Sequence, residues 1–470
     1  MKFNLLKSLT VFLLITAMLL SVSCSNTDID ENIDNENNDP VQETKEPKQL
    51  ELNLVTYRAN QETYNLFIDE FRKEYPEITV NVKNYENWDE YIFDYLKTDL
   101  PLGNAADVIF FDTLDTYNVY KLAENGLFAD INELDKKYGG LLKWDDYNKI
   151  VMDAGIIDGK QLIMPLKHSL PTLVTTQDFL ANNEIAYKDG ATLREFNDSV
   201  MALFEGKELG KDLVFSNWTF AFFPWMYTLG CDFEFKDYAH VPVINDKFYD
   251  MLDMYLEVYP APYNPTLDHS KYSSGFTDML GVGDTMFISS NNFANLYTQE
   301  LNELEYVSYI VKAHYDKDIA IIQYPNYDGV EDSNVYVSQS LAILSQSPNL
   351  EAAYKFVSFM MNYDNVLIEF DLWNAGVSGI SVNKKYNEKL KEVYSDVTKS
   401  KEFEKREYHQ MPQEFLDSYF DILDNVSNCI LPDGNVWVMV SSIMSGIENG
   451  KSIEEAVQQY EESINRYLQE

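Results

Sequence analysis

The sequence predicts an α/β protein, because strands and helices alternate from the start of its folded part. Leu52–Tyr57 is apolar and rich in β-forming residues, and Thr63–Tyr75 has apolar residues at helical spacing. A second strand, Ile78–Val82, is followed by a second helix, Trp88–Leu96. A third buried strand then ends at Asp112. Strands separated by helices need crossover connections, so these three strands are expected to form a parallel sheet.

Polar and aromatic side chains follow the first and third of these strands. Tyr57, Arg58 and Asn60 come at the end of the first strand, and Asp112 ends the third. Ligands of parallel sheets bind at the carboxyl ends of the strands. No glycine-rich turn accompanies these residues, which argues against a nucleotide and for another small solute.

Residues 1–23 are predicted to be an export signal. Two lysines precede an apolar run over residues 9–20, which is too short to span a bilayer. Small residues then lead to Cys24, as in a bacterial lipobox, although Leu20 lies four residues before the cysteine instead of three. Cys24 is therefore expected to be the lipid-bearing mature N-terminus; ordinary signal-peptidase cleavage is the alternative.

The segment 24–50 is predicted to be a disordered acidic tether. It is rich in Asp, Glu and Asn and has almost no large apolar side chains, so it cannot bury enough surface to become ordered. A flexible segment of this length spans about 25–30 Å, which would lift a domain off a membrane surface.

The net charge of the chain bears on which partners it can bind. The 470 residues include 77 acidic and 36 basic side chains, for a formal net charge of −41. Such a field repels nucleic acid, so no nucleic-acid partner is expected.

Beyond Cys24, the sequence contains only Cys231 and Cys429. Two free thiols are expected in preference to a disulfide, although the spacing does not decide whether the two cysteines pair.

Later elements are predicted from local signals. Asp158-Gly159 is a two-residue hairpin turn, and Thr192 with Glu195 forms a capping box. A strand is predicted at Leu173–Thr176, and buried strands at Ile319–Pro325 and Ser340–Leu344. Thr285–Phe293 is predicted to be a strand that runs into a polar turn and a helix. Helices are predicted at Gln177–Asn182, Phe248–Val258 and Leu350–Met361. The C-terminal stretch Val436–Leu468 is predicted to form two helices broken at Gly450, with Ser452 capping the second.

The order of these landmarks resembles that of the extracellular solute-binding proteins of ABC importers, family 1 or maltose-binding-like. The matching pieces span almost all of the mature chain, although residues 386–411 have no counterpart. They are the opening strand and helix, then GNAADV (103–108), ENGL (124–127), DGK (158–160) through Met164-Pro165, GDTM (283–286), AYKF (353–356) and GKSIEEA (450–456).

The resemblance implies a two-lobe periplasmic-binding-protein-like fold of the class II type, with a ligand cleft between lobes joined by crossing strands. Lobe 1 would comprise 51–166 plus 324–376, and lobe 2 would comprise 167–323 plus 377–470. The crossings would lie near Lys167, Tyr324 and Gly376.

An enzymatic function is not expected. The sequence has no H-E-x-x-H motif and no Cys/His cluster with zinc spacing, and Gly376–Gly379 is not a nucleophile elbow. Spacing alone does not exclude a paired-carboxylate glycosidase among so many acids. No metal or cofactor is predicted.

Binding of a sugar is favoured, because aromatic rings bury sugar faces while polar side chains hold the hydroxyls. Each aromatic can instead be a core residue, Asp112 can be a helix cap, and His168 can be a hinge side chain. The predicted ligand-binding residues are Tyr57, Arg58, Asn60, Asp112, His168, Trp218, Phe222, Trp225, Asn291, Asn292, Phe293, Trp373 and Trp437.

The resemblance predicts a monomeric substrate-binding lipoprotein on the outer face of the cell membrane. It would capture a sugar or oligosaccharide by hinge closure and deliver it to the membrane permease subunits. The alternatives are a binder of a peptide, an amino-acid derivative or a metal chelate, and a cell-surface glycan-active enzyme or adhesin.

Overall fold

The computed structural model describes most of the chain after residue 49, and the description below is confined to that part. The predicted signal peptide, the tether and Cys24 lie outside it. The described residues are 50–57, 61–85, 87, 90–100, 102, 106–112, 118–203, 213–215, 235–236, 240–258, 273–274, 276–288, 301–329, 331–362, 380–399 and 411–469.

The predicted strand–helix alternation at the start of the fold is confirmed. The elements are β1 (Leu50–Tyr57), α2 (Gln61–Glu74), β2 (Ile78–Tyr85), η1 (Glu90–Asp99) and β3 (Val108–Asp112). β1 pairs in parallel with β2 on one side and with β3 on the other. The second helix, η1, is wound as a π-helix.

Seven strands of the described chain join in one mixed sheet, in the order β14-β6-β13-β3-β1-β2, with β15 also paired to β13. The added strands are β6 (Met164–His168), β13 (Ser333–Ile343), β14 (Ile380–Ser381) and β15 (Val426–Ile430). β13 is antiparallel to β3 and β6 but parallel to β15. It is long because its first half pairs with β15 and its second half with β3.

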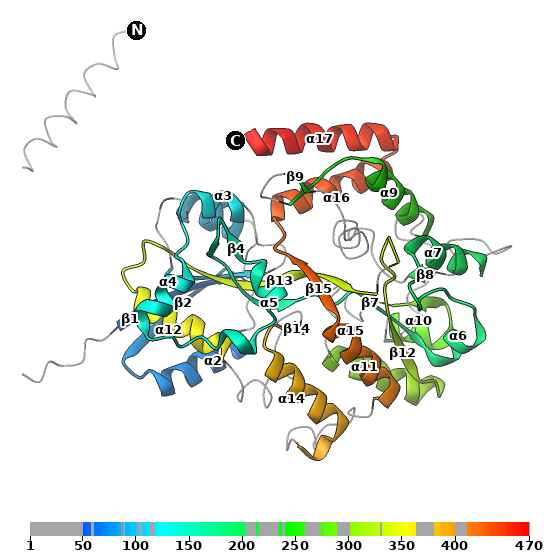
Figure 1. Cartoon of the computed structure of the whole chain (residues 1–470), viewed down its shortest axis with the longest axis horizontal. Helices are drawn as coiled ribbons and strands as arrows, with labels where there is room; N and C mark the ends of the chain where they lie inside the picture. The colour runs from blue at the N-terminus through cyan, green and yellow to red at the C-terminus, as the bar shows by residue number, and fades with distance from the viewer. Residues whose placement is uncertain are drawn as a thin grey trace, which may run out of the picture. The chain divides into compact units, whose positions relative to one another are not determined.

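Helices with an apolar face surround this sheet. α5 (Lys149–Asp153) contacts β6 and β15, and α4 (Ile131–Tyr138) contacts α12 (Leu350–Met361). α3 (Val119–Glu124) contributes buried residues to the same core. α12 contacts β1, β13, α2 and α4 (Figure 1). The ring of Phe356 on α12 meets that of Phe71 on α2 edge to face at 5.1 Å, so the two helices share one buried layer.

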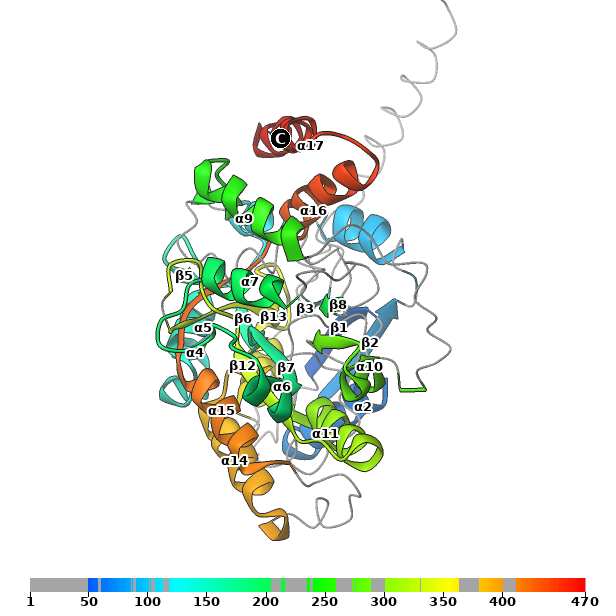
Figure 2. The same cartoon turned by 90° about the vertical axis from the view of Figure 1, so that its right-hand side faces the viewer.

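A second, smaller core surrounds a two-stranded ribbon. β7 (Thr172–Thr176) and β12 (Ile319–Gln323) pair antiparallel. The helices around the ribbon are α6 (Gln177–Asn182), α10 (Phe276–Val282), α11 (Leu301–Tyr315) and α15 (Gln413–Asp424), visible together in Figure 2. Val174, Ile321 and Phe415 are buried in this core. The chain thus changes sheet between β6 and β7, and again between β12 and β13; the lobe boundaries themselves stay a prediction.

The remaining elements complete the description. They are η2 (Trp144–Asp146), β4 (Ile156–Ile157), β5 (Lys160–Gln161), α7 (Leu193–Ala202), β8 (Leu213–Phe215), β9 (Phe235–Lys236), β10 (Val241–Pro242), α9 (Asp246–Val258), β11 (Thr285–Phe287), α14 (Lys384–Ser395), η5 (Val397–Lys399), α16 (Gly434–Glu448) and α17 (Ile453–Gln469). Among the described helices, none combines the length and the apolar character that crossing a bilayer requires.

Several local predictions are confirmed. β4 and β5 form the expected hairpin, in which Asp158 and Gly159 take the positive φ angles of 51° and 74° that this turn requires. Thr192 and Glu195 form a capping box, and Ser452 accepts a hydrogen bond from the backbone N–H of Glu455 at the start of α17.

One of the two later cysteines is described. Cys429 lies on β15, and burial raises the pKa of its thiol. Cys231 lies outside the described residues, so the absence of a disulfide stays a prediction.

Candidate functional site

The ends of β1 and β3 lie at the same edge of the large sheet. The two strands are parallel, and Val55 pairs with Ile109, so Tyr57 and Asp112 both lie just beyond this pair. The structure therefore places these two predicted residues together along the backbone. Their side chains, and Arg58 and Asn60 as a whole, are outside what the structure describes.

A row of polar positions continues from Asp112 across the sheet. Asp112 lies opposite Gln339 of β13, Gln339 lies opposite Lys167 of β6, and Lys167 lies opposite Ser381 of β14. Sequence reasoning did not select Gln339, because nothing local says which strand lies beside β3. The polar run Ser338–Ser340, which lies between the apolar residues Val337 and Leu341, was the available signal.

His168 is buried at the end of β6, where the chain leaves the large sheet. Its Nδ1 lies 2.7 Å from the carbonyl oxygen of Ser169, so we assign the ring proton to Nδ1, which donates to that oxygen. Burial lowers the pKa of His168 to about 4, and the ring is therefore neutral at pH 7. The neighbouring Ser169 is held by Tyr336, whose backbone N–H donates to the Ser169 hydroxyl at 3.0 Å.

The first turn of α16 is fixed by a buried carboxylate. Asp433 accepts hydrogen bonds from the backbone N–H groups of Asn435 (2.8 Å) and Val436 (3.4 Å), which would otherwise lack partners. The Tyr467 hydroxyl donates to the same carboxylate at 2.8 Å. Burial raises the pKa of Asp433 to about 6, although these hydrogen bonds act in the opposite direction.

Trp437 lies in this anchored first turn, and its backbone N–H donates to the Asp433 carbonyl at 2.9 Å. The indole is half-buried and packs against the main core. Its Nε1 is buried and has no hydrogen-bond partner in the described chain. A buried N–H without a partner costs about 1–3 kcal/mol, so its persistence calls for an explanation.

The other predicted binding residues lie outside the described residues, so their placement stays a prediction. They are Trp218, Phe222, Trp225, Asn291, Asn292, Phe293 and Trp373.

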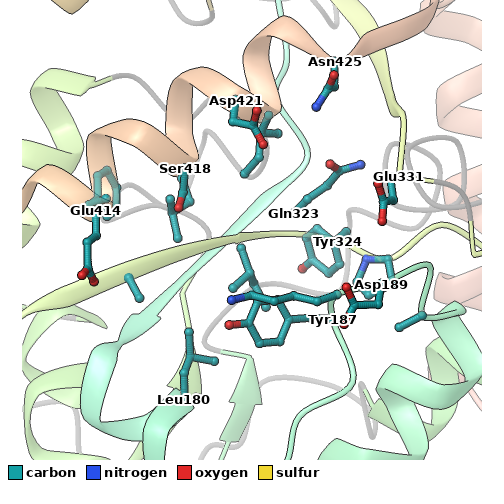
Figure 3. A pocket seen from close by; sticks show the side chains of 18 of the residues that line it. Leu180, Tyr187, Asp189, Gln323, Tyr324, Glu331, Glu414, Ser418, Asp421 and Asn425 are labelled. Atoms are coloured by element: carbon teal, nitrogen blue, oxygen red, sulfur yellow. The ribbon is translucent and has the colours of Figure 1, made fainter.

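The structure also shows a hollow where the sequence predicted none. A cavity of about 660 Å³ lies along β12, between α15 and the segment 187–191 (Figure 3). Its lining includes Tyr187, Gln323 and Asp421, and none of the residues predicted for the solute site. No group of three or more His, Cys, Asp or Glu side chains in the described part of the chain is arranged to hold a metal ion.

The fold is that of two-lobe periplasmic solute-binding proteins. A profile of bacterial extracellular solute-binding proteins matches residues 67–399, and the chain belongs to that family. The family places the protein outside the cytoplasmic membrane, in the extracellular space or periplasm, and it is a family of binding proteins. No curated protein sequence matches this chain.

Three solved structures illustrate the likeness of fold. The sugar-binding protein MalE from Xanthomonas citri has 13% identity over 88% of this chain and 96% of its own, with a TM-score of 0.62. The galacto-N-biose-/lacto-N-biose I-binding protein of Bifidobacterium longum, in complex with lacto-N-biose, has 13% identity over 91% and 98%, with a TM-score of 0.59. An ABC substrate-binding protein from Listeria monocytogenes, in complex with cycloalternan, has 16% identity over 89% and 98%, with a TM-score of 0.56.

Proposed function

We propose that this protein is the substrate-binding lipoprotein of an ABC importer and that its solute is a sugar or oligosaccharide. The observation that carries the choice of solute is the Trp437 indole, which lies half-buried on the anchored first turn of α16 and whose buried N–H has no partner among the described residues. A sugar ring presents C–H faces to an aromatic ring and oxygen atoms to a donor. The similar structures named for sugars support the same class of solute.

The opposite contacts would come from the polar edge of the large sheet. Tyr57, Arg58, Asn60 and Asp112 would supply them, with Gln339 beside Asp112. Aromatic and amide residues of the predicted second lobe would contact the other face of the solute: Trp218, Phe222, Trp225, Asn291, Asn292 and Phe293. Trp373 and the neutral His168 would lie near the crossings between lobes.

Solute that touches both lobes favours the closed form, because those contacts are missing when the lobes are apart. The proposed lobes are 51–166 plus 324–376 and 167–323 plus 377–470. Solution scattering should therefore show a smaller radius of gyration when solute is added. Scattering curves that superimpose with and without a tightly bound sugar would rule out hinge closure.

Isothermal titration against maltose, lacto-N-biose, cycloalternan and simple monosaccharides tests the choice of solute. Trp437→Ala is expected to weaken binding of the cognate sugar by about 2–4 kcal/mol, as for other buried aromatic contacts. Trp437→Phe, which keeps a ring but loses the N–H, is expected to cost about 1–3 kcal/mol. Trp144→Phe is the matched control, because the Trp144 Nε1 already donates to Asp135 at 3.2 Å. Equal affinities for the wild type and both Trp437 variants would refute the assignment of this residue.

Membrane attachment through Cys24 is a separate part of the proposal. Two or more acyl chains hold a protein stably at a membrane, and each buried CH₂ contributes ~0.8 kcal/mol. Cys24→Ala is expected to release the protein from the membrane fraction. Intact mass of the wild type should show acyl groups on a chain beginning at Cys24; another N-terminus without acyl mass would contradict lipidation.

Product analysis of the sugars used for isothermal titration, after incubation with the protein, distinguishes a binding protein from a glycan-active enzyme.

A further inference from the structure

The cavity in Figure 3 follows one edge of β12, and the hydrogen bonds beyond the β7–β12 ladder show which backbone groups face it. The Tyr324 N–H donates to the Pro171 carbonyl at 3.2 Å, and the Gln177 N–H donates to the Asp318 carbonyl at 2.9 Å. In an antiparallel pair, residues alternately direct both backbone groups toward the partner strand and away from it. The even-numbered residues of β12 therefore face β7.

Ile321 and Gln323 consequently turn their backbone N–H and C=O groups away from β7. Both residues line the cavity. In the described part of the chain, neither residue makes a backbone hydrogen bond on that side. β12 thus presents an open strand edge, and such an edge is a template for a further strand.

The walls of the cavity suit the side chains of an added strand. Phe415 and Ile422 of α15 are buried on one side, and Leu180 and Tyr187 lie half-buried on the other. Side chains of a strand alternate between its two faces, so an added strand would direct one set toward α15 and the other toward Tyr187. Figure 3 shows α15 passing above β12 while Tyr187 lies below it.

The rim of the cavity is strongly acidic. Asp189, Glu331, Glu414 and Asp421 stand around it, with Lys188 as the lining cation. Within the described residues, none of these four carboxylates forms an ion pair or a side-chain hydrogen bond. Glu414 and Asp421 come from α15 and the other two from separate loops, and the described residues do not converge as metal ligands would. Their spread along the strand edge complements a row of positive charges.

We propose that this groove binds an extended, lysine- or arginine-rich segment of a partner protein as an added strand on β12. Backbone hydrogen bonds to Ile321 and Gln323 would supply the register, and the acidic rim would select basic side chains. The groove is separate from the proposed solute site and does not depend on the identity of the solute.

Fluorescence anisotropy of the full mature chain with a labelled Lys-Val-Lys-Val-Lys-Val-Lys peptide tests the proposal. Binding is expected at 0.15 M salt. A peptide of the same charge with alternate backbone amides N-methylated should bind at least tenfold more weakly, because it cannot complete the strand ladder. Hydrogen exchange in the segment 319–325 should slow when the unmodified peptide is added.

Charge reversals on α15 test whether the peptide binds in this groove or is attracted only by the overall negative charge of the protein. Glu414→Lys with Asp421→Lys, on the groove side, should weaken binding at least tenfold. The control, Asp417→Lys with Asp424→Lys, changes the same number of exposed charges on α15 outside the cavity lining and should weaken binding less than threefold. Equal losses for the two double variants, or equal binding of the N-methylated peptide, would overturn the proposal. So would self-association of the protein through this edge in sedimentation.

Discussion

The Tyr467 hydroxyl donates a 2.8 Å hydrogen bond to the buried carboxylate of Asp433, which joins the end of α17 to the first turn of α16. Because Asp433 also caps the turn that carries Trp437, this contact positions the proposed stacking residue. The carboxylate lies in a site that disfavours its charge, since burial raises the pKa of Asp433 from 3.8 to about 6.

We expect Asp433 to oppose folding above pH 6. A carboxyl whose folded-state pKa lies above its unfolded value adds stability below about pH 4, and that stability is lost as the pH rises through 6. The change is about 3 kcal/mol for this pKa difference. Asp433→Asn keeps an acceptor for the helix cap, so urea unfolding should show it gaining stability over the wild type as the pH rises from 4.5 to 7.5. Asp130→Asn, at the partly exposed cap of α4, is the control. If the difference in free energy of unfolding between the wild type and Asp433→Asn stays constant from pH 4.5 to 7.5, the expectation is wrong.

His168 is expected to change the pH dependence of stability in the opposite direction. Its folded-state pKa of about 4 lies below the ordinary value of 6.5, so its stabilising effect is present above pH 6.5 and is lost as the pH falls toward 4. The loss amounts to about 3 kcal/mol. His168→Asn keeps a donor near the Ser169 carbonyl and should lose less stability than the wild type between pH 7 and pH 4.5 in urea unfolding. His314→Asn, on an exposed part of α11, should match the wild type. If His168→Asn loses as much stability on acidification as the wild type does, titration of the His168 ring does not cause that loss.

Asp107 is expected to be essential for the start of β3. Its buried carboxylate accepts from the Asn53 backbone N–H at 2.7 Å and from the Ser347 hydroxyl at 2.6 Å, which links β1, β3 and the turn before α12. Asp107→Asn places an amide donor against one of these donors and should lower the free energy of unfolding by about 1–3 kcal/mol. Asp69→Asn removes an exposed charge on α2 and its surface ion pair with Arg72, and should change the free energy of unfolding by less than about 0.5 kcal/mol. Thermal unfolding of both variants makes the comparison, and equal melting temperatures would refute this role.

Local structure followed from neighbouring residues in the sequence. The helix predicted at Leu350–Met361 has those bounds in the structure, and so does the helix predicted at Gln177–Asn182. The Asp158-Gly159 turn, the Thr192–Glu195 capping box and the Ser452 cap also formed as predicted, because turn and cap chemistry involves residues only a few positions apart. The parallel pairing of β1, β2 and β3 followed from the same local alternation of strands and helices.

Only the tertiary structure decided which distant strands lie side by side. It extended the predicted strand Ser340–Leu344 back to Ser333 and set it between β3 and β6, which brought Gln339 beside Asp112 and Lys167. Among the described residues, it also left the Trp437 Nε1 without a partner and one edge of β12 unpaired. Apolar periodicity and turn residues can be recognised in a single sequence. The order of strands in a sheet cannot, because it depends on packing between segments far apart in the chain. The sequence therefore determined the fold class and the local elements, whereas packing decided which polar groups meet and which are left unpaired.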